Sequence, residues 1–95
     1  MDFDKLVHQP TRLQIFAYLY QHGEATFSQL KADLDVTEGN LSSHIQRMEE
    51  AGAVAVEKEF VDRKPQTTYR LTDDGRNKFE DHIGTLESLI DSLGD

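Results

Sequence analysis

The sequence predicts a mainly α-helical domain with one small β-hairpin, an α+β fold in the order helix, helix, helix, helix, strand, strand, helix. Three observations predict this fold. The first half of the sequence contains residues typical of helix ends. Two segments with alternating apolar residues follow, joined by a connection that contains a proline. In the last quarter of the sequence, apolar residues recur at helical spacing. A chain of 95 residues has about the length of one domain, so residues 1–95 are expected to share a single core.

Two helices are expected before Gly23. Residues 2–8 can form a short first helix, and Pro10 suits the first turn of the second, which ends where Gly23 can adopt a left-handed cap. Apolar residues surround this second helix almost completely. We therefore expect one face to pack in the domain and another to contact a second subunit.

The next two helices form a predicted helix-turn-helix over about residues 26–52. Thr26 and Gln29 have the spacing of a capping box at the start of the helix FSQLKADL. After the short connection DVT, Thr37 is expected to cap the helix EGNLSSHIQRMEEA, which Gly52 closes. Two helices joined by a tight turn are typical of this motif.

A hairpin is expected over about residues 53–71. AVAVEKEF alternates so that Val54, Val56 and Phe60 lie near one side, and TTYRL alternates as well. The connection VDRKPQ is expected to be a loop, where Pro65 is tolerated. Arg70 falls on the exposed side of its strand, where it can contact a ligand or pair with Glu57 or Glu59.

The last helix is expected over about residues 73–93, capped by Thr72. Its apolar positions are spaced 4, 3, 4 and 3 residues apart, as in a narrow heptad seam. Phe79 and Ile83 are expected in the core of the domain, and the later positions at a contact between two copies of the chain. The residues expected at this dimer interface are Phe3, Ile15, Tyr18, Leu86, Leu89, Ile90 and Leu93.

Composition limits the functions to consider. The absence of cysteine excludes disulfides and thiolate metal sites, and no apolar run can cross a membrane, so a soluble cytoplasmic domain is expected. The net charge of −8 argues against nucleic acid at first, but its distribution matters more than its sum. Residues 72–95 carry seven acidic and two basic residues, a balance of −5, whereas residues 37–71 are almost neutral.

The order of elements is that of a winged helix domain, and the chain resembles the small winged-helix transcriptional regulators related to the MarR and ArsR groups. The likeness runs from about residue 2 to residue 86, through HQPTRLQIFAYL, ATFSQLKADLDVTEGNLSSHIQRMEEAGAV and TTYRLTDDGR. The resemblance implies a homodimer that binds a palindromic site in double-stranded DNA. The helix after Thr37, the recognition helix, would enter the major groove, and the hairpin, the wing, would lie on the phosphate backbone or in the minor groove.

The expected DNA contacts lie on the polar face of the recognition helix and at the wing. Leu41, Ile45 and Met48 share the core side of that helix, so small polar residues and one cation face outward. Many regulators of this type carry more cations on the recognition helix than the single Arg47 found here. The wing is therefore expected to contribute more of the binding in this chain. The candidate residues are Thr37, Gly39, Asn40, Ser42, Ser43, His44, Gln46 and Arg47 from the helix, and Arg63, Lys64, Gln66 and Thr67 from the wing. A solvated polar helix face and a solvated loop are the plainer alternatives.

Neither catalysis nor a cofactor is expected. Ser42, Ser43 and His44 point in different directions on a helix, and no carboxylate is placed to orient the imidazole. The four histidines lack ligand spacing, so no metal site is expected and each is interpreted as a lone surface residue. The sequence identifies no small-molecule effector.

The alternative function is a winged-helix adaptor that binds protein rather than DNA. Such an adaptor has no need for Arg63 and Lys64 at the wing tip.

Overall fold

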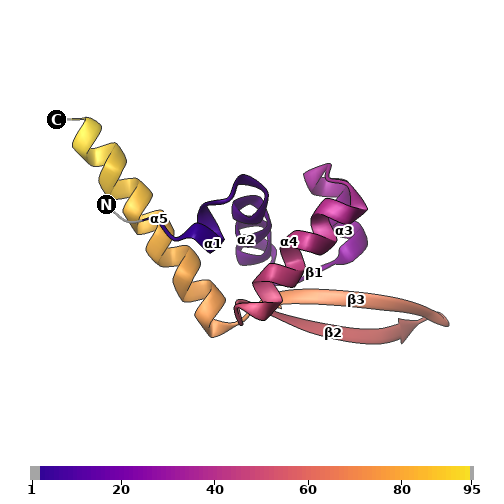
Figure 1. Cartoon of the computed structure of the whole chain (residues 1–95). Helices are drawn as coiled ribbons and strands as arrows, with labels where there is room; N and C mark the ends of the chain where they lie inside the picture. Colours follow the sequence, from indigo (N-terminus) through magenta and orange to yellow (C-terminus); the bar gives the residue numbers. More distant parts are fainter. Residues whose placement is uncertain (1–2, 95) are drawn as a thin grey trace.

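The structure, a computed structural model, describes residues 3–94 and has the predicted mainly helical fold with a hairpin (Figure 1). Asp2, expected in the first helix, lies outside the described residues. The elements in chain order are α1 (Lys5–His8), α2 (Pro10–His22), β1 (Ala25–Thr26), α3 (Phe27–Leu34), α4 (Glu38–Glu50), β2 (Val54–Val61), β3 (Lys64–Leu71) and α5 (Asp73–Leu93).

The hairpin belongs to a three-stranded antiparallel sheet with the order β1-β3-β2. The additional strand, β1, pairs Ala25 with Tyr69 and Thr26 with Thr68. The sequence did not predict it, because two residues cannot show an alternating pattern. This short strand holds the start of α3 against the base of the wing.

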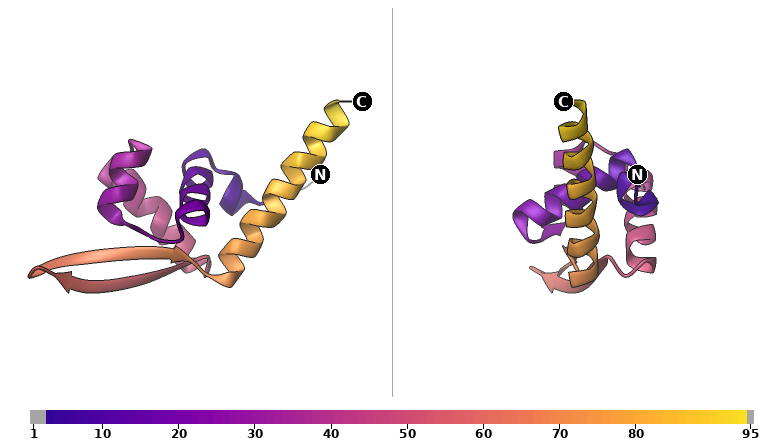
Figure 2. Two further views of the ribbon diagram at one scale, coloured as in Figure 1. Left: turned by 180° about the vertical axis from the view of Figure 1, so that it is seen from behind. Right: turned by 90° about the vertical axis from the view of Figure 1, so that its left-hand side faces the viewer.

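The molecule is elongated, with extents of 57 × 25 × 21 Å. Figures 1 and 2 show helices α1 to α4 gathered over the base of the hairpin. The wing tip projects from one end of this body, and the C-terminal half of α5 projects from the other. The two projecting segments therefore leave much of their surface uncovered within one chain.

The core lies between the helices and the base of the sheet. The predicted inner face of α4 is confirmed, since Leu41, Ile45 and Met48 are buried. Phe79 is buried and Ile83 is partly buried against the same cluster, as expected. The other core residues are Val7, Ile15, Phe16, Leu19, Ala25, Leu30, Ala53, Val54, Tyr69 and Leu71.

The predicted helix caps are present. Thr26 Oγ1 accepts from the Gln29 backbone N–H at 3.1 Å, while the Gln29 side chain accepts from the Thr26 N–H at 2.9 Å. Thr37 Oγ1 accepts from the Asn40 N–H, and Thr72 Oγ1 accepts from the Gly75 N–H. These side chains satisfy N–H groups that a helix start leaves unpaired.

The expected six-residue loop at the wing tip is wrong. The turn consists of Asp62 and Arg63 alone, with φ angles of 52° and 66°, and both strands continue to it. Positive φ at both central residues is what a two-residue hairpin turn requires. Val61 and Lys64 then form the first hydrogen-bonded pair, so the next pair, Phe60 opposite Pro65, lacks ladder hydrogen bonds and tolerates the proline.

The predicted common side of Val54, Val56 and Phe60 is confirmed, but the three residues differ in burial. Val54 is buried and Val56 is half-buried, but Phe60 on the same face is 79% exposed. The alternation is real, yet the strand runs beyond the helices that would cover its end. Sequence alternation reports the face of a residue and not how far the covering layer extends.

The interpretation of each histidine as a lone surface residue is wrong for His82. This residue of α5 is 3% exposed, and its Nε2 lies 3.2 Å from Nδ1 of His8. Phe3 stacks on the His8 ring at a centroid distance of 4.6 Å. Burial lowers the pKa of His82, the charge of His8 lowers it further, and Asp4 acts in the opposite direction. The pair joins α1 to α5.

None of the helices within residues 3–94 has the length and apolar character needed to cross a membrane.

Candidate nucleic-acid interface

The outer face of α4 is exposed and polar, as the sequence predicts. Most of the candidate residues on this helix are exposed, whereas the predicted core residues on the opposite side are buried. Ser43, Gln46, Arg47 and Glu50 line one hollow of about 340 Å³ on this face. Gln46 Nε2 donates to Glu50 Oε1 at 3.2 Å. The face therefore offers neutral hydrogen-bonding groups, with one cation and one acid toward its C-terminal end.

Gly39 lies in the first turn of α4. No heavy atom lies within 4 Å of the position that a Cβ would take at Gly39. Packing within the chain therefore gives no reason for glycine here, although glycine weakens a helix by about 0.5–1 kcal/mol relative to alanine. The missing side chain leaves the start of α4 open to close approach from outside.

His44 turns away from the exposed face and contacts α2. Its Nδ1 lies 3.1 Å from Nη1 of Arg12 and must accept this hydrogen bond, because a guanidinium only donates. The imidazole proton therefore resides on Nε2. Burial, followed by the charges of Arg12 and Arg47, lowers the pKa of His44. Both effects favour the neutral form of the ring at the side of α4.

Arg12 is a residue that sequence reasoning missed. It lies near the start of α2, and no local pattern relates it to α4, 32 residues later in the chain. Its Nε donates to the Leu6 carbonyl at 2.7 Å, and Nη2 donates to the Lys5 carbonyl at 3.2 Å. Arg12 therefore connects α1, α2 and α4.

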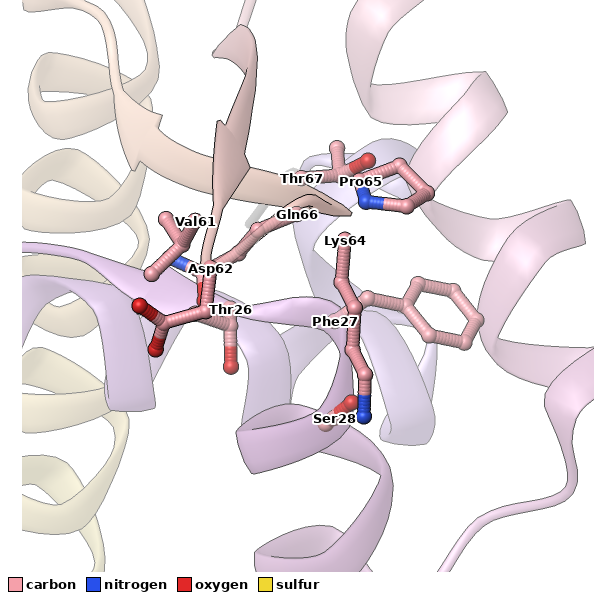
Figure 3. A pocket seen from close by; sticks show the side chains of 9 residues that line it. All are labelled: Thr26, Phe27, Ser28, Val61, Asp62, Lys64, Pro65, Gln66 and Thr67. Carbon is pink, nitrogen blue, oxygen red and sulfur yellow. The ribbon is translucent and has the colours of Figure 1, made fainter.

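The wing and the start of α3 border an open cavity of about 570 Å³ (Figure 3). In Figure 3 the Lys64 side chain extends from the wing toward the N-terminus of α3, where Ser28 is placed. The wing candidates Gln66 and Thr67 also line this cavity, whereas Arg63 is exposed in the turn outside it. The lining residues are Thr26, Phe27, Ser28, Val61, Asp62, Lys64, Pro65, Gln66 and Thr67.

Arg70 is placed apart from these cations. Its Nη1 lies 3.8 Å from Oε2 of Glu57, and both side chains are more than half exposed. This pairing is one of the alternatives that the sequence left open. An exposed pair of this kind contributes little stability.

The residues expected at a dimer contact divide into accessible and buried ones. Ile90 is 66% exposed and Leu93 is 76% exposed, while Leu86 and Leu89 are half-buried. Phe3 is exposed, and the half-buried Tyr18 donates its hydroxyl to Asp33. Ile15, by contrast, is completely buried in the core of its own chain and has no surface to offer a partner.

Within residues 3–94, no three or more histidine and carboxylate side chains come together as metal ligands.

Three comparisons relate this geometry to known proteins. Residues 11–90 match the family described as "Winged helix DNA-binding domain". An uncharacterized protein of Methanocaldococcus jannaschii, MJ0432, is 33% identical over 89 residues, covering 94% of this chain and 97% of that protein. The solved structure of a transcriptional regulator homologue from Pyrococcus horikoshii is 38% identical, with a TM-score of 0.87 and coverage of 93% of this chain and 87% of that one.

A further solved structure, HlyU from Vibrio cholerae, is 25% identical, with a TM-score of 0.68 and coverage of 80% and 78%. The predicted resemblance to winged-helix transcriptional regulators is confirmed.

Proposed function

Because this chain belongs to the winged helix DNA-binding domain family, we propose that it is a transcriptional regulator that binds a palindromic DNA site as a homodimer. The observation that carries the proposal is the juxtaposition of two uncovered surfaces, the polar face of α4 and the wing with Arg63 and Lys64 at its tip. Neither surface is needed for the core. Both have the chemistry that contacts base edges and phosphates.

In this proposal α4 enters the major groove with its N-terminal turns leading. Asn40, Ser43 and Gln46 offer hydrogen-bonding groups to base edges, and Gly39 permits the helix backbone to come close. Glu50, near the end of the helix, repels phosphate and stays at the margin of the contact.

The wing supplies most of the sequence-independent attraction. Lys64 borders the cavity between the wing and α3, and Arg63 projects from the turn, so both cations are free to face a phosphate backbone. Neither forms an ion pair within the described residues. An unpaired cation gains more from a phosphate than one already neutralised by a carboxylate.

The end of α5 supplies the dimer contact. Ile90 and Leu93 are large apolar side chains exposed on a helix that extends beyond the body of the domain. Two copies of this seam, with the half-buried Leu86 and Leu89, can pack across a two-fold axis. The two recognition helices would then meet half-sites about 34–36 Å apart, one turn of DNA.

The experiment compares the parent protein with Ile90→Glu by sedimentation and by selection from a pool of random duplexes. The parent is expected to sediment as a dimer and to enrich an inverted repeat. Ile90→Glu is expected to be a monomer and to enrich at most a half-site, because a buried charge without a partner is costly. Ser88→Glu adds the same charge at an exposed position on a different face of α5 and should remain dimeric.

Two outcomes would contradict the proposal. If the parent is a monomer, or if Ile90→Glu is still a dimer, α5 does not form the proposed dimer contact. A parent that is dimeric but enriches no sequence would point to the adaptor function instead.

A further inference from the structure

A second group of cations lies on the side of α4 that faces α1 and α2. Lys5, Arg12 and Arg47 line one hollow of about 400 Å³, together with Leu6, Glu50 and Ala51. Only Arg47 belongs to the recognition face that the sequence predicts. The chain holds 10 lysine and arginine residues against 18 acidic ones, so three cations around one hollow are a notable concentration.

Arg12 is fixed in place, yet its donors are not exhausted. Its contacts to the Leu6 carbonyl, the Lys5 carbonyl and His44 use three of the five N–H groups of a guanidinium. Within residues 3–94, the remaining two have no partner. The side chain is thus pre-positioned by α1 and α4 and can still donate to a ligand that enters the hollow.

The hollow also carries uncompensated positive charge. Within the described residues, neither Lys5, Arg12 nor Arg47 pairs with a carboxylate, since the ion pairs there join Arg70 to Glu57 and Lys78 to Asp4. Partial burial and the charge of Arg47 lower the pKa of Arg12, which indicates that the two guanidinium groups repel each other. Glu50 lines the same hollow and opposes an anion there, but its one carboxylate faces three cations, so positive charge remains in excess.

We propose that Lys5, Arg12 and Arg47 bind one DNA phosphate on the α1 side of the recognition helix, at a site separate from the wing. This inference rests on the proposed function and adds Lys5 and Arg12 to the DNA-binding surface. An anion relieves the repulsion between the two guanidinium groups, and a phosphate oxygen accepts charge-assisted hydrogen bonds from them. With the wing beyond α3 and this site beside α1, the DNA backbone would be held on both sides of α4 (Figure 1).

The test measures the affinity of one fixed duplex for the full chain by fluorescence anisotropy over a range of salt concentrations. Lys5→Gln and Arg12→Gln are each expected to weaken binding to every sequence alike and to flatten the log–log salt slope. The three cations share one phosphate, so the loss of slope is at most about 0.9 per subunit. Arg76→Gln is the matched control. It removes the same charge from a residue on α5 that lies over the Tyr20 ring, and it should leave the slope unchanged.

Arg12→Gln also removes three internal hydrogen bonds, so its thermal unfolding is compared with that of the parent. If Arg12→Gln does not fold, the phosphate site is tested by Lys5→Gln alone, because Lys5 is exposed and its replacement should not affect folding. The phosphate site would be overturned if the parent binds DNA and the salt slope is unchanged in Lys5→Gln or in a folded Arg12→Gln. The proposed regulator function would then still stand. A parent that binds no DNA would overturn the function itself.

Discussion

Replacing Gly75 by alanine is expected to destabilise the protein by about 3 kcal/mol or more, although alanine is the better helix former. A Cβ at this position would lie 1.9 Å from the carbonyl oxygen and 2.8 Å from the carbonyl carbon of Ala53. Both are backbone atoms, so no side chain can rotate away. The start of α5 would have to move off the end of the α4–β2 connection.

Hydrogen bonds make that movement costly. The Ala53 carbonyl accepts from the Thr72 N–H at 3.0 Å, and Thr72 Oγ1 donates to the Gly52 carbonyl at 2.6 Å. Displacing α5 would break contacts that also cap the helix, since Thr72 Oγ1 accepts from the Gly75 N–H. The glycine in YRLTDDG is therefore explained by a close backbone approach, at a helical position where its φ angle is ordinary.

Gly84→Ala is the matched control, because it places the same substitution in the same helix. No heavy atom lies within 4 Å of the Cβ position there, so alanine should raise the free energy of unfolding by about 0.5–1 kcal/mol. Urea denaturation of both variants measures the difference. Equal stabilities would show that α5 does not approach Ala53 as closely as described.

Neutralising the wing with Arg63→Gly and Lys64→Gln is expected to weaken DNA binding and to flatten its salt dependence by about 1.8 per subunit, at about 0.9 per lost phosphate contact. The fold should tolerate both changes. Arg63 has a φ of 66°, a left-handed conformation that glycine adopts without the cost of about 1–2 kcal/mol that other residues bear. Lys64 is exposed, so its shortening leaves no cavity.

The control for this variant is Asp62→Gly, in the same turn. Asp62 also has a positive φ, 52°, so glycine relieves the backbone in the same way while a negative charge is removed. Asp62→Gly should bind DNA at least as tightly as the parent. If Arg63→Gly with Lys64→Gln kept the affinity and the salt slope of the parent, the wing would have no part in DNA binding.

Local signals in the sequence were sufficient for most of the helices. The capping box at Thr26 and the caps at Thr37 and Thr72 each depend on a residue three positions away, so their pattern is complete in the sequence. The buried face of α4 follows from helical spacing for the same reason. The prediction that the polar face of α4 lies on the surface is confirmed.

Features that depend on distant contacts could not be predicted. The bond between Arg12 and His44 joins residues 32 positions apart, and the contact between His8 and His82 joins residues 74 apart. The exposure of Phe60 depends on where the helical layer ends above the hairpin, and the burial of Ile15 on which face of α2 turns inward. None of these is encoded in a local pattern.

The sequence did not predict the length of the wing, for a different reason. A proline and two cations favour a loop, but an Asp-Arg turn with positive φ at both residues closes the hairpin earlier. Pro65 then occupies a position without a ladder hydrogen bond, so the strand accommodates it. The pair Asp-Arg is not among the residue pairs typical of a two-residue hairpin turn, such as Asn-Gly and Asp-Gly, so the sequence did not indicate the turn.

We expect this acidic chain to bind DNA through the phosphates, using two small cationic surfaces. The most direct measurement is the affinity of the purified protein for a random-sequence duplex by fluorescence anisotropy, titrated with salt. A log–log slope of about −3 or steeper is expected, because the wing and the recognition helix of two subunits together neutralise several phosphates. Absence of binding even at low salt would contradict the claim. The acidic surface would then dominate, and a protein partner would be the ligand to seek.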